Sequence, residues 1–169
     1  MTSNRKIISL DVGDARTGVA ITDNLGLTAQ PFTTIEHKTL KELFVHIKKI
    51  IIQHKIAEIV IGLPLEMSGI EGKRAEKIRK LGQKLKTFLK NDINLEENTP
   101  TNKVTEKNET FIVLPNIVFW DERLTTNQAE KIVIGSKLKN KEKSSALDRV
   151  SATIILQAYL ESKLQPILN

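Results

Sequence analysis

Residues 6–23, KIISLDVGDARTGVAITD, decide the fold that the sequence predicts. The apolar run Lys6–Val12 ends in an acid, and a second short run, 17–23, follows after a turn that contains glycine and aspartate. A third run of the same kind covers 30–36. Three short strands in quick succession predict an antiparallel meander.

Beyond the meander, the apolar spacing changes from that of strands to that of helices. A first helix is predicted after Thr39, which has capping spacing with Glu42, and a second begins at about Glu71. Between these helices, 57–63 (AEIVIGL) is continuously apolar, as is typical of a buried parallel strand.

The carboxyl-terminal part of the chain repeats this alternation. Residues 117–121 (IVFWD) predict a fifth strand, 125–134 a helix, and 146–162 a last helix after a basic loop. The whole order predicts an α/β fold whose five-stranded mixed sheet has three antiparallel strands, then parallel strands, with helices on both faces.

The length and composition limit the other possibilities. The 169 residues fit a single domain over 1–169, in which the polar, aperiodic segment 91–116 is interpreted as a mobile insertion. The absence of cysteine excludes thiol catalysis, cysteine zinc sites and disulfides. We expect a cytoplasmic protein, because there is neither a signal peptide nor an apolar run of about 20 residues. The net charge of +6 favours a polyanionic partner, although it also suits a merely well-solvated surface.

Three acids are candidates for chemistry, and each has a plainer alternative. Asp11 lies in an apolar strand, where a carboxylate is costly unless it is paired or metal-bound, but it could also bond the following turn. Glu122 ends the fifth strand, on one face with Val118 and Trp120, but it could pair with Arg123.

Asp148 falls in the first turns of the predicted last helix. Residues with helical spacing from it are small or apolar, which lets the helix lie close to the sheet. The alternative is a cap formed with Ser145, and taken alone that alternative is favoured. Considered together, the three acids suit Mg²⁺, which prefers oxygen ligands and can activate water for phosphodiester hydrolysis.

Four blocks of sequence, in this order, resemble one family. They are LDVGDARTGVAITD, IVIGLPLEMSGIEGKRAEKIRK, VFWDERLTTNQAE and SSALDRVSATIILQAYLES. Together they look like the YqgF family, also called RuvX or the Holliday junction resolvase family. The chain departs from the usual pattern at Ala15, where lysine is common, and at Glu66 and Ser68, where asparagine and aspartate are usual.

The resemblance implies an RNase H-like fold and a nuclease that depends on Mg²⁺ or Mn²⁺, with two ions. It places the family's acids on Asp11, Glu122 and Asp148, as both catalytic residues and metal ligands. It also implies a role in 5′-end processing of pre-16S rRNA during ribosome biogenesis. The expected partner is therefore pre-16S rRNA or a pre-ribosomal particle, bound by a monomer or homodimer.

Candidate nucleic-acid-binding residues complete the prediction. The resemblance singles out Arg16, and basic residues stand at the start of the second helix and near two of the acids; the candidates are Arg16, Lys73, Arg74, Arg123 and Arg149. Two other functions stay open: a resolvase of branched DNA, for which a dimer is expected, and a non-catalytic RNA-binding assembly factor. An actin-like ATPase would need two copies of the first block, and the chain has one.

Overall fold

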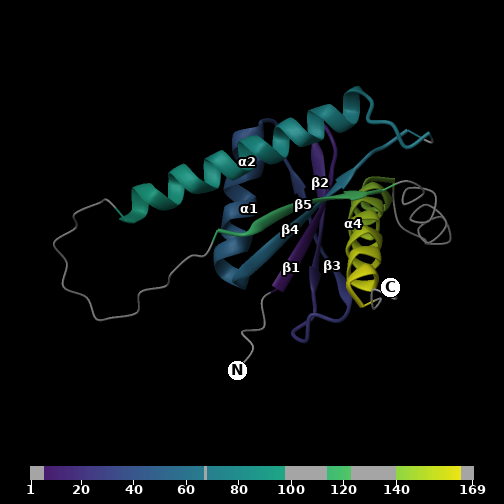
Figure 1. The fold of residues 1–169 in the computed structure, drawn as a ribbon, viewed down its shortest axis with the longest axis horizontal. Helices are drawn as coiled ribbons and strands as arrows, with labels where there is room; N and C mark the ends of the chain where they lie inside the picture. Colours follow the sequence, from purple (N-terminus) through teal and green to yellow (C-terminus); the bar gives the residue numbers. More distant parts are fainter. Residues whose placement is uncertain (1–5, 67, 98–113, 123–139, 165–169) are drawn as a thin grey trace, which may run out of the picture.

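The computed structural model describes residues 6–66, 68–97, 114–122 and 140–164. Within them, five strands form a mixed sheet in the order β3-β2-β1-β4-β5 (Figure 1). The strands are β1 (Lys6–Val12), β2 (Arg16–Thr22), β3 (Ala29–Glu36), β4 (Ile56–Leu63) and β5 (Asn116–Asp121). Pairing is antiparallel for β1–β2 and β2–β3 and parallel for β1–β4 and β4–β5. The predicted strand arrangement is confirmed.

Helices cover both faces of this sheet, as predicted. Helix α1 (Leu40–His54) and helix α2 (Lys73–Glu97) pack on one face and share the main apolar core with β1, β2 and β4. Helix α1 starts at the predicted cap, because the Thr39 hydroxyl accepts a hydrogen bond from the Glu42 amide at 3.2 Å. Helix α4 (Asn140–Leu164) packs on the opposite face, against β1, β2 and β3 (Figure 1).

The strand alternation assigns each side chain of β1 to one of the two faces. Ile8 and Leu10 enter the α1–α2 core, whereas the Ser9 hydroxyl donates to the carbonyl of Ala152 on α4 at 2.6 Å. Asp11, two residues after Ser9, therefore faces α4. Glycine lets α4 come very near the sheet, since a Cβ at Gly18 would lie 1.9 Å from the backbone oxygen of Asp148.

Two predicted boundaries are wrong. Helix α4 begins at Asn140 and not at 146, because Arg16 and Thr34 bond Ser144 and Ser145 in its polar first turns, which have no apolar periodicity. Helix α2 continues to Glu97, into the segment predicted as an insertion. The ion pair between Lys48 of α1 and Asp92 (2.9 Å) supports this extension.

Some predictions fall outside the described residues: the rest of the insertion, 98–113, and the predicted helix 125–134. No helix within the described residues is both long enough and apolar enough to cross a bilayer.

Candidate active site

The structure brings the three candidate acids to one end of the sheet, on the face that α4 covers. Asp11 lies near the carboxyl end of the central strand β1, and Glu122 directly follows β5. The Glu122 amide donates to the carbonyl of Leu63, the last residue of β4, at 3.2 Å. Asp148 reaches the same end from α4. Parallel strands deliver their carboxyl ends to one edge, which is why residues distant in sequence meet there.

The acids lie close enough to disturb one another's ionisation. Burial raises the pKa of Asp11, and the charge of Asp148 raises it further, while Arg74 and a hydrogen bond from Ser151 lower it. Burial raises the pKa of Glu122 to about 7, with a further contribution from the charge of Asp11. Like charges in a half-buried place favour protons or cations. The site therefore has an electrostatic requirement for a positive charge.

Glycine in β4 provides the space that Glu122 occupies. A Cβ at Gly62 would lie 2.2 Å from Oε2 of Glu122 and 2.7 Å from Cδ1 of Ile155. The neighbouring residues Val118 and Trp120 pack with Ile155 against α4. The predicted common face of Val118, Trp120 and Glu122 is thus confirmed, and it is the face of Asp11.

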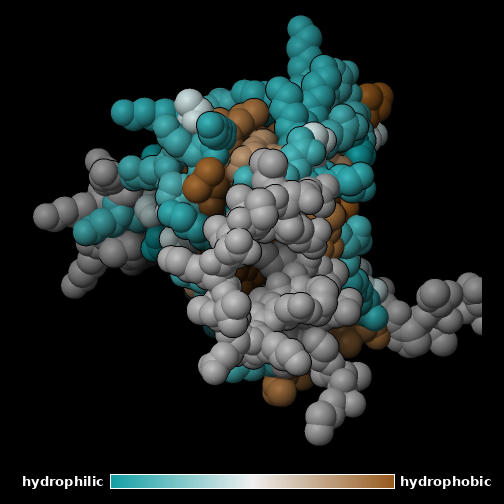
Figure 2. Space-filling model, turned by 90° about the vertical axis from the view of Figure 1, so that its left-hand side faces the viewer, coloured by the Kyte–Doolittle hydropathy of each residue, from teal (hydrophilic) through white to brown (hydrophobic). Residues whose placement is uncertain are grey.

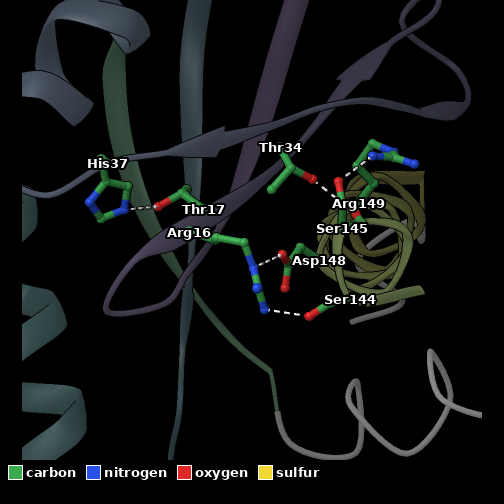
Figure 3. Close-up of polar contacts among 8 residues, drawn as sticks. All are labelled: Arg16, Thr17, Thr34, His37, Ser144, Ser145, Asp148 and Arg149. Atoms are coloured by element: carbon green, nitrogen blue, oxygen red, sulfur yellow. Dashed lines mark hydrogen bonds and ion pairs between the residues drawn. The ribbon is translucent and has the colours of Figure 1, made fainter. Parts of the chain in front are cut away.

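An arginine from β2 holds Asp148 (Figure 3). Nε of Arg16 lies 2.9 Å from Oδ2 of Asp148, and its Nη2 donates to the Ser144 hydroxyl at 2.5 Å. The side chains of Arg16 and Asp148 are 41% and 21% exposed, so solvent reaches this pair. Arg16 supplies Asp148 with a cation from within the chain.

The capping role considered for Asp148 is wrong. Helix α4 starts at Asn140, so Ser145 and Asp148 lie inside the helix and not at its amino terminus. The backbone carbonyl of Ser145 instead accepts from the Thr34 hydroxyl at 2.9 Å, and its own hydroxyl accepts from Arg149 at 2.7 Å (Figure 3). Asp148 is thereby left to face the other acids.

The donor set suits a hard divalent cation. Three carboxylates offer oxygen ligands, and burial, with a further contribution from neighbouring negative charge, raises the pKa values of two of them, a cost that a bound cation would relieve. In the part of the chain that the structure describes, no three His, Cys, Asp or Glu side chains are already arranged as ligands of one ion. The carboxylate of Asp148 is instead bonded to Arg16.

The other candidate residues are distributed around this end of the sheet. Lys73 and Arg74 begin α2 and line a hollow beside the turn that follows β1. Arg149 bonds Ser145, whereas Arg123, with its predicted pairing to Glu122, lies outside the described residues.

The sequence prediction names neither Ser151 nor His37. Ser151, three residues after Asp148 on the same helical face, is buried and bonds Asp11, and its spacing was the available signal. His37 is buried, with its Nε2 at 3.1 Å from the Thr17 hydroxyl (Figure 3). Desolvation lowers its pKa, which favours the neutral ring.

The sheet order and the facing helices define the class: this is an RNase H-like α/β protein. The solved structure titled "T. thermophilus RuvC in complex with Holliday junction substrate" shares the fold, with a TM-score of 0.50 and 10% identity over 95% of this chain and 96% of that one. The family model described as "RuvX: Holliday junction resolvase" matches residues 5–111 and 101–162.

Relatives of known name agree with that match. Proteins named "Putative pre-16S rRNA nuclease" are similar over nearly their whole length. The protein of Carboxydothermus hydrogenoformans is 38% identical, over 94% of this chain and 97% of the relative. That of Caldanaerobacter subterraneus subsp. tengcongensis is 36% identical over 94% and 97%. The chain therefore belongs to the RuvX family, whose enzymes are hydrolases of phosphodiester bonds.

Proposed function

We propose that this protein is a metal-dependent nuclease that processes the 5′ end of pre-16S rRNA during ribosome biogenesis. The observation that supports the nuclease assignment is the position of Asp11, Glu122 and Asp148, from three separate elements, at one end of the sheet, with raised pKa values at two of them. The names of the relatives support the ribosomal RNA precursor as substrate. The partner is thus nucleic acid, and the place of action is the cytoplasm.

The acids Asp11, Glu122 and Asp148 would hold the metal, Mg²⁺ or Mn²⁺, as two ions. When bound, such ions activate a water and stabilise the leaving oxygen of a phosphodiester. The chain's own residues position the ligands: Ser151 bonds Asp11, and the missing side chain of Gly62 makes room for Glu122. Arg16 holds Asp148 through an ion pair, at the same end of the sheet as Asp11 and Glu122.

The decisive variant is Asp11→Asn, because it removes one charge from the site and keeps the shape of the side chain. We expect the rate of precursor rRNA cleavage at saturating substrate to fall by about a hundredfold or more. The reason is that loss of a ligand weakens metal binding and displaces the metal from its productive position. The assay follows the 5′ end of a precursor fragment with Mg²⁺, Mn²⁺ or EDTA. Folding of the variant is checked by circular dichroism.

The matched control is Glu161→Gln, near the carboxyl end of α4. Glu161 is exposed and accepts a hydrogen bond from Gln157 at 3.2 Å, so its replacement changes the net charge equally, 13 residues along the helix from Asp148. Its cleavage rate should stay near that of the wild type. A folded Asp11→Asn protein that cleaves as fast as wild type would show that the assignment is wrong.

Branched DNA is the second candidate substrate, and the family description is the observation that favours it. The same assay therefore includes single-stranded RNA and a four-way DNA junction. If a dimer cuts the junction symmetrically and precursor rRNA is not cleaved, the substrate is branched DNA and not ribosomal RNA. RNA binding that is unchanged by loss of all three acids and of Mg²⁺, with no cleavage of any substrate, would indicate a non-catalytic assembly factor.

A further inference from the structure

A continuous groove runs along α2, beginning near the turn that follows β1. Its first hollow, of about 590 Å³, is lined by this turn and by the starts of α1 and α2. A second hollow, of about 300 Å³, shares Lys73 and Lys77 with the first. A third, of about 500 Å³, lies between α1 and α2 and shares Lys80 and Lys84 with the second. Shared lining residues make the three hollows one groove.

Four exposed lysines follow this groove, and we call it the lysine groove: Lys73, Lys77, Lys80 and Lys84. Spacings of four, three and four residues place them on one flank of α2. At 1.5 Å per residue, the row spans about 16 Å, roughly the length of five phosphates of one strand in a double helix. Among the described residues, only Lys77 of these four has an ion-pair partner, which is Asp14. Lys73, Lys80 and Lys84 are therefore free to bind external anions.

Arg74 connects the groove with the carboxylates. It lines the first hollow, and its charge lowers the pKa values of both Asp11 and Glu122. Residues 12–14, which directly follow Asp11 in the chain, line the same hollow, so this end of the groove lies at the end of the sheet that carries the acids. A polyanion that extends from the groove to the acids would therefore pass the positive charge of Arg74.

The floor of the groove is apolar and includes aromatic rings. Phe44 and Phe88 line the third hollow with their ring centroids 5.6 Å apart, and Phe88 is only partly buried. Leu81 continues this floor toward the first hollow. In the view of Figure 2, hydrophilic residues dominate the described surface in the upper part of the picture, with a few hydrophobic residues among them.

A cationic rim above an apolar, aromatic floor suits a single strand better than a duplex. In a single strand, bases are free to lie on apolar and aromatic surfaces while the phosphates meet lysines. A duplex presents mainly its phosphates and hides the faces of its bases. With a duplex bound, the apolar floor of the groove would have no bases to contact.

We propose that the lysine groove binds a single-stranded segment of the nucleic-acid substrate next to the scissile bond. The position relative to the scissile bond rests on the proposed nuclease function, whereas the binding itself does not. Phosphates lie along the four lysines, and bases contact the floor near Phe88. The groove thereby favours substrates that have an unpaired strand beside the cleavage position.

The test measures binding without cleavage, by fluorescence anisotropy in EDTA. The probe is an unstructured RNA of about 20 nucleotides, titrated between about 50 and 200 mM salt, because each lost phosphate contact lowers the slope of log K against log salt by about 0.7. The double variant Lys80→Gln/Lys84→Gln should lower the magnitude of the slope by about 1.4. The matched control Lys86→Gln/Lys90→Gln, on the opposite flank of α2, should leave it unchanged.

Further arms test the single-strand assignment. Phe88→Leu should weaken binding of the single strand by about tenfold without changing the slope, because stacking does not depend on salt as ion release does. A duplex of equal length should bind with little sensitivity to Phe88→Leu. If Phe88→Leu and Lys80→Gln/Lys84→Gln weaken binding of the duplex as much as binding of the single strand, the groove does not select single strands.

The outcomes separate this proposal from the nuclease assignment. If the two lysine double variants change the salt slope equally, or if neither changes it, the proposed binding of a single strand by the lysine groove is wrong. Asp11→Asn should keep the wild-type slope. If no substrate is cleaved but the two double variants still differ in their salt slopes, the nuclease proposal is wrong and the proposal that the lysine groove binds a single strand is supported. If cleavage needs Asp11 but the double variants behave alike, the groove alone is wrong.

Discussion

A single absent side chain determines where the carboxylate of Glu122 can lie. A Cβ at Gly62 would meet the ends of Glu122 and Ile155, at 2.2 and 2.7 Å, and not the backbone. Such ends rotate away at low cost, but the proposed role of Glu122 as a metal ligand requires its carboxylate to keep its place. The glycine is therefore more important for chemistry than for stability.

We expect Gly62→Ala to reduce cleavage by at least about tenfold, since displacement of a reacting group by about 1 Å is costly, while the free energy of unfolding changes by about 1 kcal/mol. Steady-state cleavage and urea unfolding measure the two effects. Gly82→Ala is the control, because its Cβ would meet the Phe119 ring on the other face of the sheet. It should destabilise the protein without slowing the folded enzyme. Unchanged cleavage by Gly62→Ala would contradict the placement of Glu122.

The raised pKa of Glu122 makes stability depend on pH in the metal-free protein. Its pKa is about 7 in the folded state against an ordinary value of 4.5, so the folded state binds the proton more tightly. The contribution of Glu122 to stability is thus largest below about pH 4.5 and is lost as the pH rises through 7. In EDTA, the free energy of unfolding should fall by about 2 kcal/mol between pH 5 and 8.

Glu122→Gln is the comparison for this effect, because glutamine has no proton to lose. Urea unfolding at several pH values should give a flatter profile for the variant than for the wild type. Parallel profiles would mean that Glu122 has an ordinary pKa.

At the scale of elements, the approach of α4 to β2 depends on small residues and polar clamps. A Cβ at Gly18 would lie 1.9 Å from the backbone oxygen of Asp148 and 3.1 Å from its Cα. Backbone atoms cannot rotate away, so the whole helix would have to move. Arg16 and Thr34 bond the first turns of α4 and hold them in this position.

Gly18→Ala should therefore destabilise the protein by about 3 kcal/mol, the upper range for overpacking. Gly72→Ala is the matched control, since its Cβ would meet only the exposed side chain of Glu66. Its effect should stay below about 1 kcal/mol. Thermal and urea unfolding give both values, and similar values for the two variants would contradict the close contact of α4 with β2.

At the scale of the whole molecule, the fold stabilises a site that repels itself. Asp11, Glu122 and Asp148 come from β1, the end of β5 and α4, and folding brings their charges together at the carboxyl end of the sheet. The apolar cores on the two faces supply the opposing free energy. Cation binding should consequently stabilise the folded state as a whole.

Saturating Mg²⁺ should raise the melting temperature of the wild type by about 5 °C or more, because binding to the folded state alone at about 100 times Kd contributes about 2.7 kcal/mol. Asp11→Asn should melt higher than wild type in EDTA, since one repelling charge is gone, and should respond little to Mg²⁺. Differential scanning calorimetry with and without EDTA tests both. If Mg²⁺ raises the melting temperatures of the wild type and of Asp11→Asn equally, the metal does not bind at Asp11.

Local patterns in the sequence determined the elements and their order. Period-two and period-3.6 spacing of apolar residues is a property of neighbouring residues, and the cap at Thr39 is equally local. The sheet with three antiparallel and then parallel strands followed from those patterns. The start of α4 did not, because its first turns are polar and are held by Arg16 and Thr34 from distant strands.

The sequence by itself determined that Asp11, Glu122 and Asp148 were candidates, and that they lie at strand ends or on a helix with a small, apolar face. Only the tertiary structure decided between a cap and a site residue for Asp148, because a cap requires a helix start and α4 starts eight residues earlier, at Asn140. Only the structure placed Ser151, Arg16 and Arg74 around the acids. The reason is physical: hydrogen bonds and charges act through space, and their partners here are separated by most of the chain.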